Sequence, residues 1–161
     1  MTFPSRATRA RPCLYGHVGP YQVRPDLTVW LRSIDPAVTE GALRATLFGP
    51  TPAAEVVLGY AGDEPAGFAL FFHNYSTFLA RPGLYLEDLF VQPEHRGLGV
   101  GRRLMAELAR IALARGCGRF EWSVLDWNAP AIGFYRRLGA IGMDGWTVQR
   151  VSGEALERLA A

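Results

Sequence analysis

The chain has 161 residues, 49% of them hydrophobic, and a formal net charge of +2 at pH 7. The length suits one domain with a substantial core, and the small charge favours neither a nucleic acid nor a membrane as partner. No apolar run reaches the ~18 residues that a membrane-spanning helix needs. The two cysteines, Cys13 and Cys117, form no disulfide framework, which is typical of a reducing, cytoplasmic setting.

Residues 1–38 predict an irregular N-terminal segment. They contain five prolines, and neither a helical nor an alternating apolar period continues for long. Such a stretch buries little apolar surface and favours turns and coil. We therefore separate residues 1–38 from a regular domain over residues 39–161.

From residue 39 onward the apolar pattern becomes regular. Alternating apolar residues indicate strands, and three- or four-residue spacing indicates helices. The sequence predicts, in order, a helix over 39–48, strands over 54–61 and 67–73, a loop over 74–83, a strand over 84–91, a long helix closed by residues 116–118, a strand over 120–125, a short helix over 131–138, a strand over 146–151 and a tail helix over 153–161. This order predicts an α/β fold with a mixed sheet.

Residues 84–114 form the most informative stretch: an apolar strand, a glycine-rich turn and an amphipathic helix. The strand carries two adjacent acids, Glu87 and Asp88, which would point to opposite faces of a regular strand. The turn at 96–101 reads RGLGVG and can aim backbone N–H groups and a helix N-terminus at an anion. It lacks the Lys-Ser/Thr of a nucleoside-triphosphate loop, and its glycine spacing differs from the dinucleotide fingerprint.

A second motif, DWNAPAIGFYRRLGA, spans residues 126–140. Together the two motifs resemble those of the GNAT N-acetyltransferases, Q/R-x-x-G-x-G/A and N-x-x-A/S-x-x-F-Y-x-x-x-G-F/A. Within that family, YLED at 85–88, the pair WN at 127–128 and GW at 145–146 are most similar to the spermidine/spermine (diamine) and thialysine acetyltransferases. The resemblance covers roughly residues 39–161 and implies the GNAT fold, a mixed, mostly antiparallel sheet flanked by helices.

The resemblance also implies the ligands. Acetyl-CoA would be the co-substrate, a small-molecule amine the acceptor, and the protein a homodimer with no nucleic-acid or membrane partner. The three histidines are scattered, and no pair has ligand spacing, so no metal is predicted. The family's glycine loop holds the pyrophosphate of acetyl-CoA, and its central strand meets the pantetheine arm. The cofactor-binding residues so implied are Leu89, Phe90, Val91, Arg96, Gly97, Leu98, Gly99, Val100, Gly101, Arg102 and Asn128.

Acetyl transfer to an amine also needs an acid and a base. An alkylamine with a pKa near ~10 arrives protonated, so a carboxylate must accept its proton. Glu87 matches the family's residue for that role, and Tyr135 matches the acid that protonates the leaving thiolate. The residues predicted to contact the acceptor are Glu87, Asp88, Trp122, Asp126 and Asp144. The last three could equally be surface or core residues.

The sequence leaves the acceptor open between a polyamine, a diamine and a lysine-like amino acid. The family would place its first strand and first long helix in residues 1–38, which show no pattern for either. That helix carries some acceptor contacts in the diamine acetyltransferases. Two alternative functions stay open. An open, acid-lined groove would favour a protein or peptide N-acetyltransferase, and binding of acetyl-CoA without acetylation would favour a catalytically impaired acetyl-CoA-binding domain.

Overall fold

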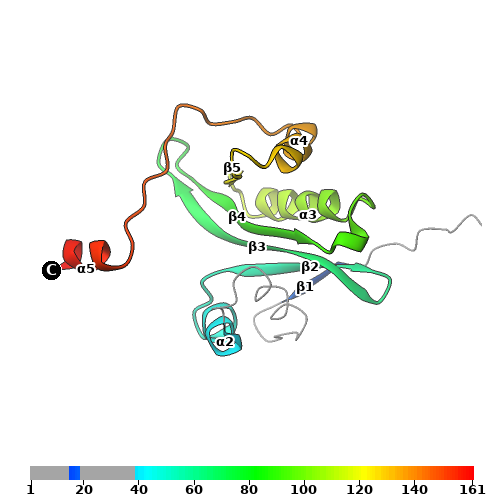
Figure 1. Ribbon diagram of the computed structural model, residues 1–161, viewed down its shortest axis with the longest axis horizontal. Coiled ribbons are helices and arrows are strands. Elements are labelled where there is room, and N and C mark those ends of the chain that lie inside the picture. Colours follow the sequence, from blue (N-terminus) through cyan, green and yellow to red (C-terminus); the bar gives the residue numbers. More distant parts are fainter. Residues whose placement is uncertain (1–14, 19–38) are drawn as a thin grey trace, which may run out of the picture. The chain divides into compact units, whose positions relative to one another are not determined.

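The computed structural model describes residues 15–18 and 39–161, and its contacts divide the chain into two units, Met1–Ser123 and Val124–Ala161. The described residues of the first unit form one sheet, whose strands lie side by side in chain order (Figure 1). The strands are β1 (Tyr15–Val18), β2 (Glu55–Ala61), β3 (Glu64–Ser76), β4 (Arg81–Val91) and β5 (Arg119–Trp122). The first four pair antiparallel, and β5 runs parallel to β4. The predicted mixed, mostly antiparallel sheet is confirmed.

Helices α2 (Glu40–Phe48) and α3 (Val100–Ala114) lie on opposite faces of this sheet (Figure 1). Thr39 caps α2 as predicted, because its Oγ1 accepts a hydrogen bond from the Ala42 N–H at 3.2 Å. On the α2 face, Leu47 packs with alternate residues of β2 and β3; the buried members of that cluster are Leu47, Val56, Leu58, Tyr60, Phe68 and Leu70. The α2 face of the sheet is therefore apolar where the helix covers it.

On the α3 face, the strand residues that alternate with the α2-face cluster pack against α3. Leu104 and Leu108 of α3 are fully buried, and Val57 and Phe71 lie beneath the helix on β2 and β3. Gly59 faces the helix: a Cβ there would be in ordinary van der Waals contact, 3.4 Å from Val100 and 3.5 Å from Leu104. The apolar face of α3 that the sequence predicts is thus the face against the sheet.

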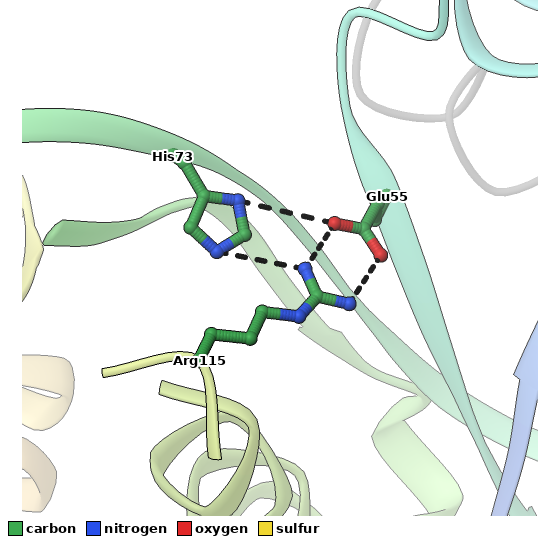
Figure 2. Close-up of polar contacts among 3 residues, drawn as sticks. All are labelled: Glu55, His73 and Arg115. Atoms are coloured by element: carbon green, nitrogen blue, oxygen red, sulfur yellow. Dashed lines mark hydrogen bonds and ion pairs between the residues drawn. The ribbon is translucent and has the colours of Figure 1, made fainter. Parts of the chain in front are cut away.

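An ion-pair cluster ties the C-terminal end of α3 to the sheet (Figure 2). Arg115, just after the helix, donates to both carboxylate oxygens of Glu55 on β2, and its Nη2 lies 2.8 Å from Oε2. Its Nη1 also lies 3.5 Å from Nε2 of His73 on β3.

Two predicted boundaries in the first unit are wrong. Residues 74–83 were expected to form a loop, yet β3 continues to Ser76 and β4 begins at Arg81, so only Thr77–Ala80 turn the chain. Cross-strand pairing here overrides the weak strand propensity of Asn, Pro and Gly. Four residues of the predicted irregular segment, Tyr15–Val18, form β1 because they pair with β2; the remainder of that prediction lies outside the described residues.

The second unit contains α4 (Ala129–Arg137) and α5 (Glu154–Ala160), so the predicted tail helix is confirmed. The strand predicted over 146–151 is wrong, since these residues adopt no regular structure. Trp146 and Val148 are 71% and 78% exposed. A strand forms only with a hydrogen-bonded neighbour, and residues 124–161 contain no strand that could pair with it. None of the helices in the described ranges is long and apolar enough to cross a membrane.

Candidate active site

The two ends of β4 differ in how they are paired. The first end pairs with β5, from Gly83 opposite Arg119 to Leu86 opposite Trp122, and there the pairing stops. On its other side, β4 remains paired with β3 as far as Val91. Among the described residues, no strand covers the outer edge of residues 87–91. That edge, which includes the predicted contacts Leu89, Phe90 and Val91, offers backbone groups to an extended ligand in the manner of an added strand.

A bulge interrupts β4 at the two acids. Asp88 pairs with Leu70 on β3. The next pair along the strand is Leu86 with Phe71, so Glu87 is the extra residue. The two neighbouring acids therefore do not follow the regular alternation of side chains between the two faces of a strand. Glu87 is exposed and Asp88 is partly buried.

The partial burial of Asp88 changes its acidity. Loss of solvent raises the pKa of the Asp88 carboxyl above its ordinary 3.8, and the neighbouring charge of Glu87 raises it further. Because Asp88 pairs with Leu70, a member of the α2-face cluster, its side chain belongs to the α2 face of the sheet. A carboxylate there can attract a cationic group that approaches from this face.

The glycine loop after β4 is fixed at one side and open at the other. The Arg96 Nε donates to the Val91 carbonyl oxygen at 3.0 Å, which folds the loop back onto the strand. Gly97 and Gly99 have φ angles of 76° and 84°, in the left-handed region that glycine adopts without strain. A Cβ at either position would meet no atom within 4 Å, so the space above both residues is open.

The start of α3 supplies the predicted anion-binding groups. Gly99 is its N-cap and provides no side-chain cap, so the first-turn N–H groups stay available to a ligand. Leu98 and Arg102 are exposed, and Gly101 is partly buried. Val100 is only 3% exposed, so its side chain belongs to the core and only its backbone can contact a ligand.

The second unit positions two further predicted residues on α4. The Asn128 Oδ1 accepts a hydrogen bond from the Ala131 N–H at 3.3 Å and caps the helix. Tyr135 is half-buried, with its ring centroid 5.2 Å from that of Phe134. Burial raises the pKa of the Tyr135 phenol above 10.0, so the phenol keeps its proton at neutral pH. A protonated phenol is suited to donate a proton.

The predicted acceptor residues do not all come together. Trp122 pairs with Leu86, on the face of the sheet that α3 covers, whereas Asp88 faces the α2 side. The structure therefore separates Trp122 from Asp88 by the thickness of the sheet. Asp126 and Asp144 are exposed residues of the second unit.

Sequence reasoning missed a polar cluster formed by Asn74, Arg119 and Glu121. The Glu121 carboxylate accepts a hydrogen bond from Asn74 Nδ2 at 3.2 Å and lies 2.9 Å from Arg119 Nε. The Arg119 Nη2 also donates to the Tyr75 carbonyl oxygen at 3.4 Å. The available sequence signal is the alternation of charged and aromatic residues in RFEW, residues 119–122, which puts both charges on one face.

An uncovered strand edge beside a glycine-rich helix start defines a class of site. The edge suits an extended, amide-containing arm, and the loop suits a phosphate group, which together match coenzyme A. No group of three or more His, Cys, Asp or Glu within the described ranges is arranged to hold a metal ion. The geometry is that of an acyl-CoA-dependent transferase.

Comparison with known proteins gives the family. The model of the acetyltransferase (GNAT) family matches residues 23–140. The chain belongs to the GNAT acetyltransferase family, whose co-substrate is acetyl-CoA, and it is an N-acetyltransferase. An integron cassette protein from V. cholerae superposes with a TM-score of 0.76 at 24% identity, covering 92% of this chain and 97% of that one, which confirms the fold.

Similar proteins act on small amines. The thialysine N-epsilon-acetyltransferase of Bos taurus is 40% identical over 136 residues, covering 76% of this chain and 78% of that protein. The L-ornithine N5-acetyltransferase of Arabidopsis thaliana is 45% identical over 94 residues, covering 58% of this chain and 41% of that protein. The resemblance stated from the two sequence motifs is thus confirmed.

Proposed function

We propose that this enzyme transfers the acetyl group of acetyl-CoA to a primary amine of a small molecule by direct attack in a ternary complex. The observation that carries the proposal is the uncovered edge of β4 at residues 87–91, next to the open glycine loop. The acceptor class is a polyamine, a diamine or a lysine-like amino acid, in keeping with the relatives' substrates. No acetyl-enzyme forms in this scheme.

The cofactor is held by backbone groups on both sides of the loop. The pantetheine arm extends along residues 89–91, and one N–H of this edge polarises the thioester carbonyl. The pyrophosphate lies over residues 96–102 at the start of α3. Asn128, which already caps α4, contributes a hydrogen bond to the pantetheine with its amide group.

The amine loses its proton before it attacks. Glu87, exposed at the bulge, accepts that proton directly or through water. Asp88 attracts the ammonium form to the α2 face. The amine nitrogen then bonds to the thioester carbon, and the tetrahedral oxyanion collapses with cleavage of the carbon–sulfur bond while the nitrogen loses its second proton to water. The electron pair leaves on sulfur.

Tyr135 donates its phenolic proton to the departing thiolate in this proposal. The half-burial of Tyr135 and its raised pKa support the role, because the donor is protonated throughout the neutral range. The phenolate recovers a proton from solvent after each turnover. Asp126 and Asp144 add negative charge for a cationic substrate.

The test is release of free thiol from acetyl-CoA with a panel of amines, namely spermidine, putrescine, thialysine, lysine, ornithine and short peptides. Turnover with one class of small amine is expected. Tyr135→Phe should lower kcat about a hundredfold, and Tyr75→Phe, an exposed tyrosine at the hairpin of β3 and β4, serves as the matched control. Binding of acetyl-CoA without acetylation of any amine would contradict the proposal and favour a non-catalytic acetyl-CoA-binding protein.

The oligomeric state has its own measurement. We propose a homodimer in the cytoplasm, in keeping with the resemblance to the diamine acetyltransferases. Light scattering coupled to size-exclusion chromatography would give twice the mass of one chain. A monomer mass over the concentration range used for the activity assay would contradict the dimer without affecting the proposed reaction.

A further inference from the structure

The polar cluster of Asn74, Arg119 and Glu121 lies on the same face of the sheet as Asp88. On β3, Phe72 and Asn74 continue the alternation of Phe68 and Leu70, which face α2. Because side chains along a strand alternate between faces, Asn74 shares the face of Leu70, the residue that pairs with Asp88. The hydrogen bond between Asn74 and Glu121 places β5's charged residues there too.

An aromatic bridge connects the cluster to the bulge. Tyr85 on β4 pairs with Phe72 on one side and Glu121 on the other, and the ring centroids of Phe72 and Tyr85 are 5.1 Å apart. The Tyr85 hydroxyl is 2.8 Å from the Ser123 Oγ. Asp88 and Tyr85 pair with Leu70 and Phe72, which are two residues apart on β3. Because Glu121 is the neighbour of Tyr85 on β5, standard strand spacings put the Cα atoms of Asp88 and Glu121 roughly 8 Å apart. That span matches an extended ornithine or lysine side chain.

The cluster presents an acceptor side and a donor side to a ligand. The side chains of Arg119 and Glu121 are 32% and 33% exposed, so both remain reachable. Asn74 Oδ1 is buried without a hydrogen-bond partner among the described residues. With the Glu121 carboxylate it forms a pair of acceptors suited to an ammonium group, and the Arg119 guanidinium suits a carboxylate.

Gly83 provides the space in which these groups meet. It pairs with Asn74 on β3 and with Arg119 on β5. A Cβ at this position would clash with Asn74 Oδ1 and lie 3.0 Å from the Arg119 Cγ. The absence of a side chain at residue 83 therefore brings an amide oxygen, a guanidinium and a carboxylate together above one point of the sheet.

We propose that this cluster binds the α-amino and α-carboxylate groups of an ornithine- or lysine-like amino acid whose terminal amine is acetylated beside the bulge. The inference rests on the proposed function and selects one class among its acceptors. Glu121 and the Asn74 Oδ1 take the α-ammonium, and Arg119 takes the α-carboxylate. A polyamine or diamine has no carboxylate, so Arg119 disfavours its distal ammonium group by like-charge repulsion.

The unmodified enzyme can be tested with three substrates of one chain length. Putrescine is ornithine without its carboxylate, and 5-aminopentanoate is ornithine without its α-amine. We expect kcat/KM for ornithine to exceed that for either analogue by at least about tenfold, because each analogue lacks one of the two charged groups that the cluster would contact. Equal kcat/KM for ornithine and putrescine would overturn the inference while leaving the proposed acetyl transfer intact.

Arg119→Ala tests the guanidinium directly. The ratio of kcat/KM for ornithine to that for putrescine should fall at least about tenfold, mainly through KM for ornithine, since a bidentate-capable contact to the carboxylate is lost. Arg110→Ala is the matched control, because Arg110 also pairs with a glutamate, Glu107, at 2.6 Å but on the exposed side of α3. The control should leave the ratio unchanged.

Two outcomes overturn the inference in this experiment: an unchanged ratio in Arg119→Ala, or an equal fall in Arg110→Ala. If Arg119→Ala does not fold, Arg119→Lys replaces it and should show a smaller fall in the same ratio, because lysine keeps the charge but not the planar fork. Failure to acetylate any of the three substrates would instead count against the proposed function itself.

Discussion

The two ends of β4 contrast in what surrounds their backbone. At residues 83–86 the strand is paired on both sides, by β3 and by β5, and its neighbours Asn74, Arg119 and Glu121 form a network of hydrogen bonds and charges. At residues 87–91 it stays paired with β3, and no described strand lies along its outer edge. One strand thus carries both a fixed side-chain surface and an open backbone edge.

The contrast suggests that the two ends of the strand have different roles. The paired end holds side chains in a defined geometry, which is what recognition of a substrate's charges requires. The open end has an edge that no described strand covers, where an amide-containing cofactor can pair with the backbone. The bulge at Glu87 marks the boundary between the two. In this account the acetyl group would be transferred near that boundary.

The largest effect is expected at the open end, from Gly99→Val. A β-branched residue cannot adopt the φ of 84° without strain, so the loop amides and the start of α3 must move. The Kd for acetyl-CoA should rise about tenfold or more, measured by isothermal titration calorimetry. Gly116→Val is the control, since Gly116 has a φ of 70° and equally open surroundings at the other end of α3. Equal weakening of acetyl-CoA binding by both variants would contradict a specific role for the loop.

A smaller and pH-dependent effect is expected at the boundary, from Asp88→Asn. Burial and the charge of Glu87 raise the pKa of Asp88, so the folded state favours the protonated carboxyl and loses relative stability as pH rises through that pKa. The amide mimics the protonated form. At pH 7 the Tm should therefore rise by about 2 °C, while below pH ~4 the gain should vanish.

The same variant should lower kcat/KM for the amine about tenfold, because a charge that attracts the ammonium form is lost. Asp63→Asn, in the exposed turn between β2 and β3, is the control and should change neither quantity. A Tm that falls at pH 7 would show that the carboxylate stabilises the fold instead, and an increase in Tm that persists in acid would show that the gain does not come from removing the charge.

The smallest effect is expected from Glu55→Gln, in the ion-pair cluster on β2, two strands across the sheet from β4. Removing the charge weakens the contact with Arg115 (Figure 2) and should lower the free energy of unfolding by about 1 kcal/mol. Chemical denaturation would measure this change. Glu40→Gln, whose pair with Arg44 is largely exposed, should cost less. A change in acetyl-CoA affinity with Glu55→Gln would contradict a purely structural role for the cluster.

Much of this fold could be predicted because it follows from local pattern. The period of α3, the continuous apolar run of β2 and the Thr39 cap are each encoded within a few neighbouring residues. The glycine loop was predictable for the same reason, since its glycines, two of them with positive φ, lie between a strand and a helix. The strand predicted at 146–151 shows the limit, because its apolar residues have the pattern but no ladder partner within their unit.

The remainder depends on how distant residues pair, which local pattern does not specify. The bulge at Glu87 exists because Asp88 pairs with Leu70 while Leu86 pairs with Phe71. The end of the β4–β5 pairing at Leu86 opposite Trp122 is likewise a property of two strands, and it determines which backbone edge is open. The polar cluster forms only when β3, β4 and β5 pair in the observed register. The sequence around Asn74 therefore gave no sign that it could be a binding residue.

Hydrogen–deuterium exchange with and without acetyl-CoA would test the contrast between the two ends most directly. Peptides from residues 87–91 and 96–102 should gain protection when acetyl-CoA binds, because the ligand occupies the open edge and the loop amides. Peptides from β2, residues 55–61, should not change. Bound acetyl-CoA that leaves exchange at 87–91 unaltered would contradict the central claim that the uncovered edge of β4 is the cofactor site.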